Sequence, residues 1–340
     1  MPGTVLPAEW SPQSGVQITW PHAGSDWSGM LEEVTQCYLS FSKEILRREK
    51  MLVVVPEKAE IGKYFTKEEQ LNLICVEIPS NDTWARDHGG LSLFVDDKPT
   101  IADFGFNGWG LKFAANLDNQ ITSRLFKRAV FRSGVGYQNR LDFILEGGSI
   151  ESDGRGTILT TRDCLLAPNR NQPMKQDDIE HYLKQVLGAQ RVLWLNHGYL
   201  SGDDTDNHID TLARFCDETT IAYVQCSDEQ DEHFQALRAM EEELKAFVTM
   251  DGDPYRLIAL PMAEAVYDDD YRLPATYANF LIINQAVLLP FYGSPRDEDA
   301  KVQLQSAFPD REIIGVDCRP LIKQHGSLHC VTMQFPEGVL

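Results

Sequence analysis

Polar residues that could do chemistry gather in five short clusters, each directly before or after an apolar run. The clusters are marked by Asp87, Glu146, His208, Asn279 and Cys330. Successive markers are 59, 62, 71 and 51 residues apart. Such near-regular recurrence predicts one supersecondary unit repeated about an axis, with each repeat sending a loop to a shared centre.

The stretch from Gly202 to Asp210 is the most unusual of these clusters, with four acidic residues and a histidine in nine positions. His208 and Asp210 alternate, so both side chains would face the same side of an extended segment. An imidazole beside carboxylates suits acid–base work on a cation or the binding of a metal ion. A solvated acidic loop is the simpler alternative.

Cys330 is the candidate nucleophile, expected at the first position of an apolar strand that follows the turn at 326–329. A free thiol has a pKa near 8.5 and is mostly protonated at neutral pH, whereas the thiolate is the nucleophile. Chemistry at Cys330 therefore depends on whether His208 lies opposite. Without such a partner, Cys330 would only pack.

Aromatic residues accompany two of the acidic positions. Trp84 stands three residues before Asp87, and a flat apolar wall beside a carboxylate suits recognition of a flat cation. The alternative is a turn held by an internal pair between Arg86 and Asp87. Glu146 precedes two glycines, where the backbone must turn tightly or approach another group closely. The glycine-punctuated loop that contains Trp109 fits either a cavity wall or core packing.

Strands and amphipathic helices must position these clusters. Apolar, β-branched runs predict strands at Met51–Val55, Leu73–Ile78, Leu91–Val95, Thr157–Thr161, Arg191–Leu195, Thr220–Val224, Phe280–Ile283, Ala286–Pro290 and Glu312–Val316. Helical periodicity predicts helices at Leu31–Arg48, Leu117–Phe131, Gln176–Leu187, Asp228–Ala246 and Glu298–Phe308. No linker or low-complexity tract separates them, so we expect one domain over residues 1–340.

The composition is that of a folded protein, with 43% hydrophobic and 24% charged residues among 340. The formal net charge of −20 repels phosphate backbones and anionic membranes and attracts cations. We therefore expect no nucleic-acid or membrane partner. Seven scattered cysteines without a Cys-x-x-Cys pair, and a start that lacks the features of a secretory signal, predict reduced thiols and a cytoplasmic location.

Six motifs in order resemble the agmatine deiminases, a family grouped with the bacterial type of peptidylarginine deiminase. They are Trp84–Asp87, Phe104–Gly110, Glu146–Ile150, Cys164–Asn171, Asp204–Asp210 and Gly326–Cys330. The resemblance implies an α+β fold, the five-bladed α/β propeller called a pentein, with a pseudo-fivefold repeat of strand–strand–helix–strand units. It also implies hydrolysis of agmatine to N-carbamoylputrescine and ammonia, a step of polyamine biosynthesis.

By the same resemblance, Cys330 matches the nucleophile, His208 the general acid and base, and Asp87 and Asp210 the carboxylates that bind the guanidinium. Trp84 matches the stacking residue. Further substrate contacts are expected from three more residues, Asp204, Glu146 and Trp109. No metal or cofactor is implied. The expected partner is a small cationic guanidino compound, and assembly into a homo-oligomer is compatible with the sequence.

The chain departs from the family pattern at Asn207, where many relatives have glycine, at Asp204, where many have glutamate, and at 325–327. These differences concern the far end of the substrate, so peptidyl-arginine or free arginine remain alternatives. A metal-dependent hydrolase using residues 203–210, and a propeller that only binds partners, are two further readings. If the chain is a deiminase that uses Cys330, Asp87 and Asp210 should raise the pKa of Cys330 until a bound cation offsets their charge.

Overall fold

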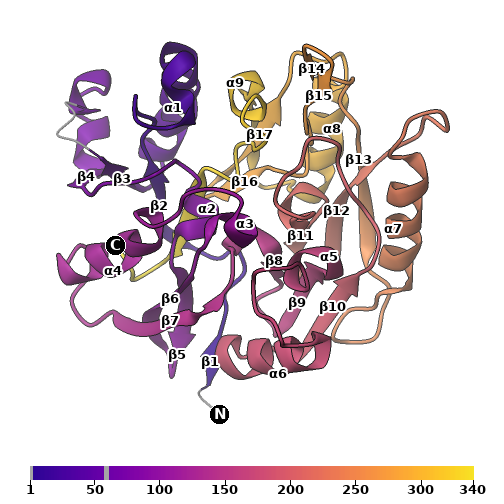
Figure 1. The fold of residues 1–340 in the computed structure, drawn as a ribbon, viewed down its shortest axis with the longest axis horizontal. Helices are drawn as coiled ribbons and strands as arrows, with labels where there is room; N and C mark the ends of the chain where they lie inside the picture. Colours follow the sequence, from indigo (N-terminus) through magenta and orange to yellow (C-terminus); the bar gives the residue numbers. More distant parts are fainter. Residues whose placement is uncertain (1–2, 57–60) are drawn as a thin grey trace.

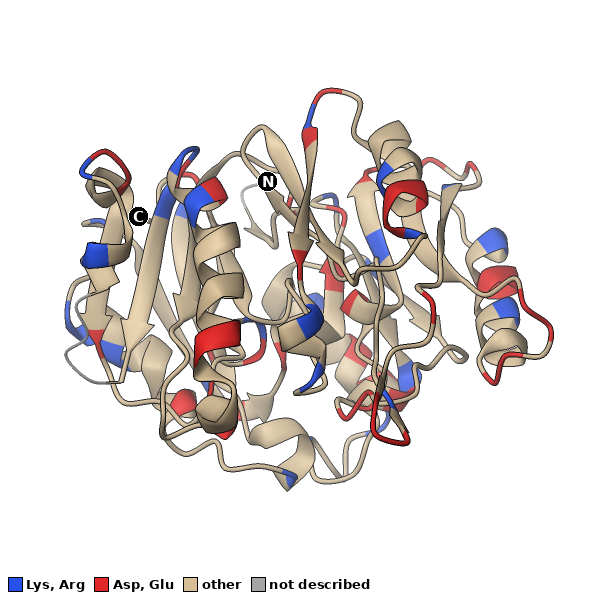
Figure 2. Ribbon diagram, turned by 90° about the horizontal axis from the view of Figure 1, so that it is seen from above, with Lys and Arg blue, Asp and Glu red and all other residues tan. Residues whose placement is uncertain are grey.

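The computed structural model describes residues 3–56 and 61–340. Within these residues, the strands form five sheets of three or four strands and one two-stranded ribbon. In Figure 1 the five larger sheets lie around the middle of the molecule, with the longer helices toward its outside. Acidic and basic residues lie mainly on helices and loops, while most of the strand ribbon is free of them (Figure 2).

The first sheet joins segments from both ends of the sequence. Its strand order is β19 (Thr332–Pro336), β2 (Gln13–Thr19), β3 (Lys50–Val55) and β4 (Leu73–Glu77). β19 is antiparallel to β2, and helix α1 (Leu31–Leu46) leads from β2 to its parallel neighbour β3. The second sheet has the order β1 (Thr4–Val5), β5 (Leu91–Val95), β6 (Lys98–Gly105) and β7 (Gly136–Ile144). Helix α4 (Ile121–Lys127) precedes β7.

Three further sheets have three strands each. The third has the order β10 (Arg191–Leu195), β9 (Thr157–Thr161) and β8 (Ile150–Ser152), with helices α5 (Arg162–Leu165) and α6 (Gln176–Leu187). The fourth contains β11 (Ala213–Asp217), β12 (Thr220–Gln225) and β13 (Arg256–Pro261), with helix α7 (Phe234–Ala246). The fifth contains β16 (Leu281–Ile283), β17 (Ala286–Phe291) and β18 (Glu312–Asp317), with helix α8 (Asp297–Ala307). The ribbon pairs β14 (Tyr267–Asp268) with β15 (Tyr271–Arg272), and helix α9 (Arg319–Ile322) follows β18.

The five larger sheets share one topology. Two strands pair antiparallel, and a helix then leads to a third strand that pairs in parallel with the middle one. A parallel neighbour requires such a crossover because a tight hairpin can join only antiparallel strands. The predicted recurrence of one supersecondary unit is thus confirmed at the level of strand pairing.

Local sequence explains why these elements form. In α1, apolar side chains at Val34, Tyr38, Phe41 and Ile45 recur every three or four residues and are buried. β3 is buried along its whole run from Met51 to Val55, as expected of a strand covered on both faces. Among the described residues, none of the helices is both long and apolar enough to cross a bilayer.

Each of the predicted strands and helices corresponds to an observed element, but two helices are shorter than predicted. The helix predicted at Leu117–Phe131 is α4 preceded by a 3₁₀ turn. The helix predicted from Asp228 begins only at Phe234, because the carboxylates of Asp228 and Asp231 accept backbone hydrogen bonds in a turn before it. The sequence reading missed several strands, among them β2, β6, β7, β11 and β13.

Two local expectations were wrong. Cys330 lies in a turn, two residues before β19 begins. His208 and Asp210 are not on an extended segment, since residues 209–211 form a 3₁₀ turn. The hydroxyl of Thr211 stabilises this turn by donating to the carbonyl of His208 at 2.8 Å.

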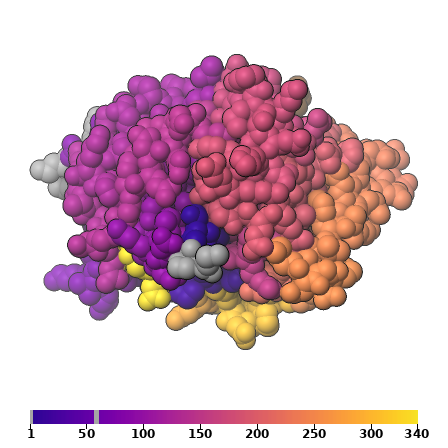
Figure 3. Space-filling model, turned by 90° about the horizontal axis from the view of Figure 1, so that it is seen from below, coloured from indigo at the N-terminus to yellow at the C-terminus, as the bar shows by residue number. Residues whose placement is uncertain are grey.

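The N-terminal segment passes between parts of the chain that are distant in sequence. In Figure 3 its indigo atoms lie between the magenta and the salmon segments, close to yellow C-terminal atoms. β1 pairs with β5, and the Ser152 hydroxyl donates to the carbonyl of Leu6 at 2.8 Å. Glu9, three residues after Leu6, is only 7% exposed. The segment therefore carries a carboxylate into the interior.

Candidate active site

Asp87 lies on the single-turn helix α2 (Ala85–His88), near the middle of the view in Figure 1. Its carboxylate receives two hydrogen bonds, from Trp109 Nε1 to Oδ2 at 2.9 Å and from the backbone N–H of Gly148 to Oδ1 at 3.1 Å. Burial raises the pKa of Asp87 to about 6, although the nearby His208 opposes that change. Asp87 is therefore held in one orientation by donors from two other loops.

Trp109 reaches Asp87 because the turn that carries it is left-handed. In helix α3 (Gly108–Leu111) all four residues have positive φ, at 70°, 54°, 81° and 69°. Glycine at two of these positions reduces the strain, since only glycine adopts this conformation freely. The side chain of Asn107 accepts a hydrogen bond from the backbone of Gly110 at 2.9 Å and donates to the carbonyl of Asn169 at 2.7 Å.

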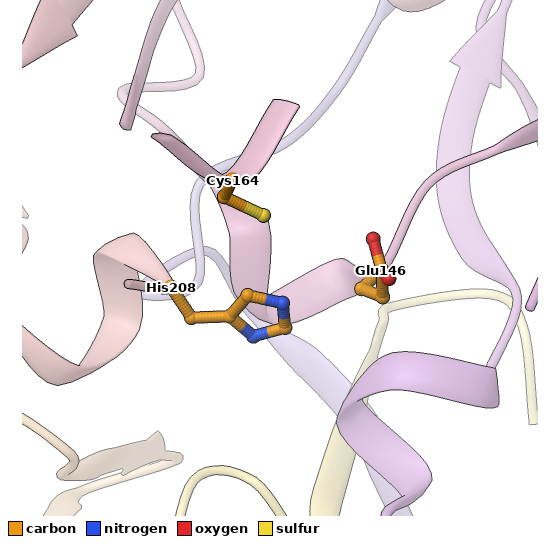
Figure 4. Close-up of side chains that lie close together, drawn as sticks. All are labelled: Glu146, Cys164 and His208. Carbon is orange, nitrogen blue, oxygen red and sulfur yellow. The ribbon is translucent and has the colours of Figure 1, made fainter. Parts of the chain in front are cut away.

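His208 is almost fully buried, and its neighbours include Cys164 and Glu146 (Figure 4). Neither ring nitrogen has a partner at hydrogen-bond distance, and Nδ1 lies 3.6 Å from Oδ1 of Asp87. Burial lowers the pKa of His208, but Asp87 and Cys164 raise it more, so that its net pKa is well above the ordinary value. The raised pKa favours the imidazolium, which is the form of His208 that can donate a proton.

Cys330 and Asp210 lie side by side. Cys330 Sγ is 3.9 Å from Oδ2 of Asp210 and 3.3 Å from Oδ1 of Asn279. Asn279 also donates to the carbonyl of Asp210 at 3.2 Å. The other carboxylate oxygen of Asp210, Oδ1, is buried without a hydrogen-bond partner in the described structure. Burial and the charges of Asp210 and Asp87 raise the pKa of Cys330 well above its usual value, as expected from the sequence.

Gly148 explains how these groups come so close together. A Cβ at this position would lie 2.7 Å from Nδ1 of His208, 2.9 Å from Oδ1 of Asp87 and 3.1 Å from Oδ2 of Asp210. The absent side chain thus leaves room for an imidazole and two carboxylates around one point of the backbone. The predicted close approach after Glu146 is confirmed at this glycine.

A cavity of about 420 Å³, open to solvent at its mouth, leads to Cys330. Among the described residues, its wall contains four carboxylates and three aromatic rings and includes no lysine or arginine. The lining residues are Asp26, Asp82, Trp84, Asp87, Trp109, Phe113, Asp204, Thr205, Gln324, His325, Gly326 and Cys330. Burial raises the pKa values of Asp82 and Asp204 to about 6. The nearby Lys112 ion-pairs with Asp206 at 2.8 Å rather than lining the cavity.

Six of the eight residues predicted for the site line the cavity or contact Cys330. The seventh, His208, lies next to Asp87, with 3.6 Å between Nδ1 and Oδ1. Glu146 does not line the cavity. It is fully buried, and both of its oxygens accept from Nε of Arg170, at 3.0 and 3.2 Å. Arg170, which also donates to the carbonyl of Thr205 at 2.8 Å, binds the carboxylate of Glu146 and so keeps it out of the cavity.

Sequence reasoning missed further residues of the site. Asn279 marked one of the five clusters but received no role, although its side chain contacts Cys330 and Asp210. Asp82 stands two residues before Trp84 and accepts a hydrogen bond from its indole N–H at 2.9 Å. Its closeness to that motif was the available signal. His329 stands directly before Cys330 inside the last motif, so the same signal was available for it, whereas Glu9, which contacts His329 beneath Asp210, gave none.

Within the part of the chain that the structure describes, two groups of side chains could offer metal ligands, Glu146 with Cys164 and His208, and Glu9 with Glu151 and His329. In each group an arginine already binds the carboxylates, Arg170 in the first and Arg214 in the second. A guanidinium at these oxygens opposes the binding of another cation.

Comparison with known proteins shows the family of this chain. The sequence model of the Porphyromonas-type peptidyl-arginine deiminase family matches residues 5–336. The chain belongs to this family.

Related proteins match this chain over nearly its whole length. An agmatine deiminase of Pseudomonas aeruginosa is 31% identical over 369 residues, which cover 98% of this chain and 96% of that protein. A Porphyromonas gingivalis protein, provisionally named an arginine deiminase, has a structure similar to this one with a TM-score of 0.96, 57% identity and 99% of each chain covered. A C. jejuni agmatine deiminase variant with substrate bound has a TM-score of 0.92 and 40% identity, covering 99% of this chain and 97% of that one.

Proposed function

We propose that this protein hydrolyses agmatine to N-carbamoylputrescine and ammonia through a covalent intermediate on Cys330. The observation that carries the proposal is the cavity itself, in which a thiol lies beside carboxylates and no lysine or arginine is among the lining residues. Agmatine has a guanidinium at one end and an ammonium at the other. An acidic cavity with aromatic walls suits both charges.

The guanidinium would be bound edge-on by Asp87 and Asp210. A guanidinium is planar and permanently charged, with five N–H donors in a fixed arrangement. Oδ1 of Asp210, which is buried without a partner, would accept one of them, and Asp87 would accept from another edge. Two carboxylates in fixed orientations hold the plane while Trp84 and Trp109 exclude water.

Cys330 and His208 would then carry the covalent chemistry. The thiolate attacks the guanidinium carbon, and His208 donates its proton to one terminal nitrogen, which leaves as ammonia. The product of this half-reaction is an S-alkylthiouronium and a neutral imidazole. His208 next takes a proton from water, and the resulting hydroxide attacks the same carbon. The carbon–sulfur bond then breaks to release thiolate, and the remaining hydroxyl proton passes to solvent or to the released ammonia, which leaves N-carbamoylputrescine.

The substrate would also help to ionise the nucleophile. In the free site, burial, Asp210 and Asp87 raise the pKa of Cys330. A bound cation between the carboxylates offsets their charge, so the thiolate becomes more favourable when a guanidinium is present. This coupling protects the thiol from unspecific reaction between turnovers.

Three carboxylates, those of Asp26, Asp82 and Asp204, would receive the far end of the substrate. All three line the same cavity. They would attract the ammonium of agmatine and repel the carboxylate of free arginine. Peptidyl-arginine carries neither charge at that position, so the carboxylates should favour it less than agmatine and more than free arginine.

We further propose that the five sheets are the blades of a pentein propeller and that residues 1–340 form one catalytic unit. Support comes from the shared strand pairing of the five sheets and from the spread of the site from Glu9 to Cys330. All seven cysteines lie within the described residues, and each is free, which supports a location in a reducing compartment such as the cytoplasm.

An ammonia-release assay tests the proposal. Agmatine, free arginine, a peptidyl-arginine and guanidinobutyrate would be compared, with Cys330→Ala as the control. We expect turnover of agmatine above the others and none in the variant. Loss of activity with a chelator, together with resistance to iodoacetamide, would instead favour the metal-dependent hydrolase. Release from peptidyl-arginine alone would change the substrate but keep the mechanism.

A further inference from the structure

Beneath the proposed site, three side chains from distant parts of the sequence form a continuous chain of contacts. Oδ2 of Asp210 is 2.7 Å from Nδ1 of His329, and Nε2 of the same imidazole is 2.7 Å from Oε2 of Glu9. The exposed fractions of the three residues are 0%, 1% and 7%. Glu9 thus connects to the carboxylate beside Cys330 through a single histidine.

The geometry determines the charge of His329. Both oxygens of Glu9 accept hydrogen bonds, Oε1 from the backbone of Ile282 at 2.8 Å and Oε2 also from Arg214 at 2.9 Å, so Glu9 is a carboxylate. A neutral imidazole has only one N–H and could donate to only one of its two carboxylate neighbours. Because both ring nitrogens face carboxylates at 2.7 Å, the imidazolium is the form of His329 that can donate to both of them.

Charge balance in the surrounding cluster supports the same assignment. Arg214 contacts Glu9 and Glu151, and Nη2 of Arg86 lies 3.7 Å from Oε2 of Glu9. With His329 protonated, the buried cluster contains three acids and three bases. Without that proton, one buried negative charge would be uncompensated, which is costly in the interior.

We propose that Glu9 and His329 are positioning residues for the deiminase reaction, which hold Asp210 ionised with its Oδ1 directed at the guanidinium. This inference rests on the proposed function. Asp210 has a lowered pKa in spite of its burial, and the hydrogen bond and charge of His329 are the main opposing causes. The imidazolium occupies Oδ2 and leaves Oδ1 for the substrate. Glu9 keeps the imidazolium in place from below.

Other charged groups near Asp210 must be counted in any pH dependence. They are His208, His329, Arg86, Arg214, Asp87 and Cys330. Removing Glu9 leaves the direct neighbours of Asp210 in place but also takes a partner from Arg214 and Arg86. Comparison with His329→Asn is therefore needed to assign a change in the titration of Asp210 to His329.

The variant Glu9→Gln separates charge from shape. Its amide oxygen can accept from Ile282, and its amide N–H can donate to Nε2 of a neutral His329, which still donates from Nδ1 to Asp210. The hydrogen bonds to Ile282 and His329 persist, the one from Arg214 is lost, and the imidazolium is no longer required. Glu49→Gln is the matched control, because Glu49 is also a buried carboxylate, 6% exposed, and accepts from the backbone of Asn284 without contacting His329 or Asp210.

The test measures agmatine kcat and KM from pH 5 to 9 for wild type, Glu9→Gln, His329→Asn, their double variant and Glu49→Gln. For Glu9→Gln we expect kcat/KM at pH 7 to fall at least about tenfold, with the acid limb moved to higher pH and partial recovery toward pH 9. The double variant should be no worse than His329→Asn alone, since Glu9 acts through His329. Glu49→Gln should retain the wild-type profile. An unmoved acid limb in Glu9→Gln, or additive losses, would overturn the proposal.

A second readout does not depend on turnover. Cys330 would be alkylated with chloroacetamidine, which carries an amidinium, and with the neutral iodoacetamide. The ratio of the two rates reports how well the site binds a planar cation, and we expect Glu9→Gln to lower that ratio at least about tenfold. If wild type prefers the amidinium reagent but does not turn over agmatine, the proposed substrate fails and the role of Glu9 stands. A wild type without this preference would overturn both.

Discussion

Asp210→Asn should make Cys330 more reactive toward a neutral reagent while it strongly slows turnover. Sγ of Cys330 lies 3.9 Å from Oδ2 of Asp210, and both residues are buried. At an effective permittivity of about 20, one unit charge at that distance opposes the thiolate by about 4 kcal/mol. Removing the charge therefore favours the thiolate by an equilibrium factor of up to about 10³. The imidazolium of His329 remains and adds to the effect.

The expected rate change is smaller than that factor, because a thiolate that forms more easily is also a weaker nucleophile. With a Brønsted coefficient of about 0.5, the gain in alkylation rate at neutral pH is about thirtyfold. Iodoacetamide labelling followed by mass spectrometry of the Cys330 peptide measures this rate separately from that of the exposed Cys75. Ammonia release should fall by about 10² to 10³ because one carboxylate of the guanidinium site is lost. Equal or slower labelling in the variant would refute the electrostatic reasoning.

Three further predictions concern the cavity and its supports. Burial raises the pKa values of Asp82, Asp87 and Asp204 to about 6, and each must be ionised to bind a cation, so log kcat/KM for agmatine should fall below pH 6 with a slope above one. Butylguanidine, which lacks the distal ammonium, should give a slope near one, and equal slopes would contradict a role for the distal carboxylates. Trp109→Phe removes the 2.9 Å hydrogen bond to a buried carboxylate, which is worth about 1.5–3 kcal/mol, so steady-state assays should show kcat/KM about ten- to a hundredfold lower; an unchanged value would mean that this hydrogen bond does not orient Asp87. Gly148→Ala would place a methyl group 2.7 Å from the histidine ring nitrogen of the site, and we expect kcat to fall at least about a hundredfold with only a small change in melting temperature; full activity would disprove the crowding argument.

Local patterns were sufficient to predict most of the regular structure. β9 and β10 are short β-branched or apolar runs with clear boundaries, and both were predicted with the observed limits. β6 was missed because it begins with Lys98 and Pro99 and contains Asp103. The carboxylate of Asp103 is tolerated in the sheet because the hydroxyl of Tyr137, on the neighbouring strand, donates to it at 2.6 Å. Such a contact depends on strand pairing and is invisible to a local pattern.

In the site, too, local sequence patterns pointed to some residues and not to others. Cys330, His208 and Asp87 stand in polar motifs that interrupt apolar runs, so their sequence neighbourhoods already distinguished them. The partner of Glu146 could not be foreseen, because Arg170 reaches it from a separate loop. Glu9 and His329 are 320 residues apart, and neither stands in a pattern that requires the other. Motifs therefore indicated the proposed reacting groups, whereas tertiary structure was needed to find the side chains that contact them.

The pairing of β2 with β19 has a consequence for how the protein can be made. During synthesis Glu9 leaves the ribosome more than three hundred residues before Cys330, and until β19 is added β2 lacks its antiparallel neighbour. Glu9 and Arg214 then face each other without the histidine that completes their cluster. A polypeptide that ends before residue 330 would consequently be an incompletely folded chain rather than a slow enzyme. The thiol of Cys330 is therefore added only shortly before β19 can pair with β2.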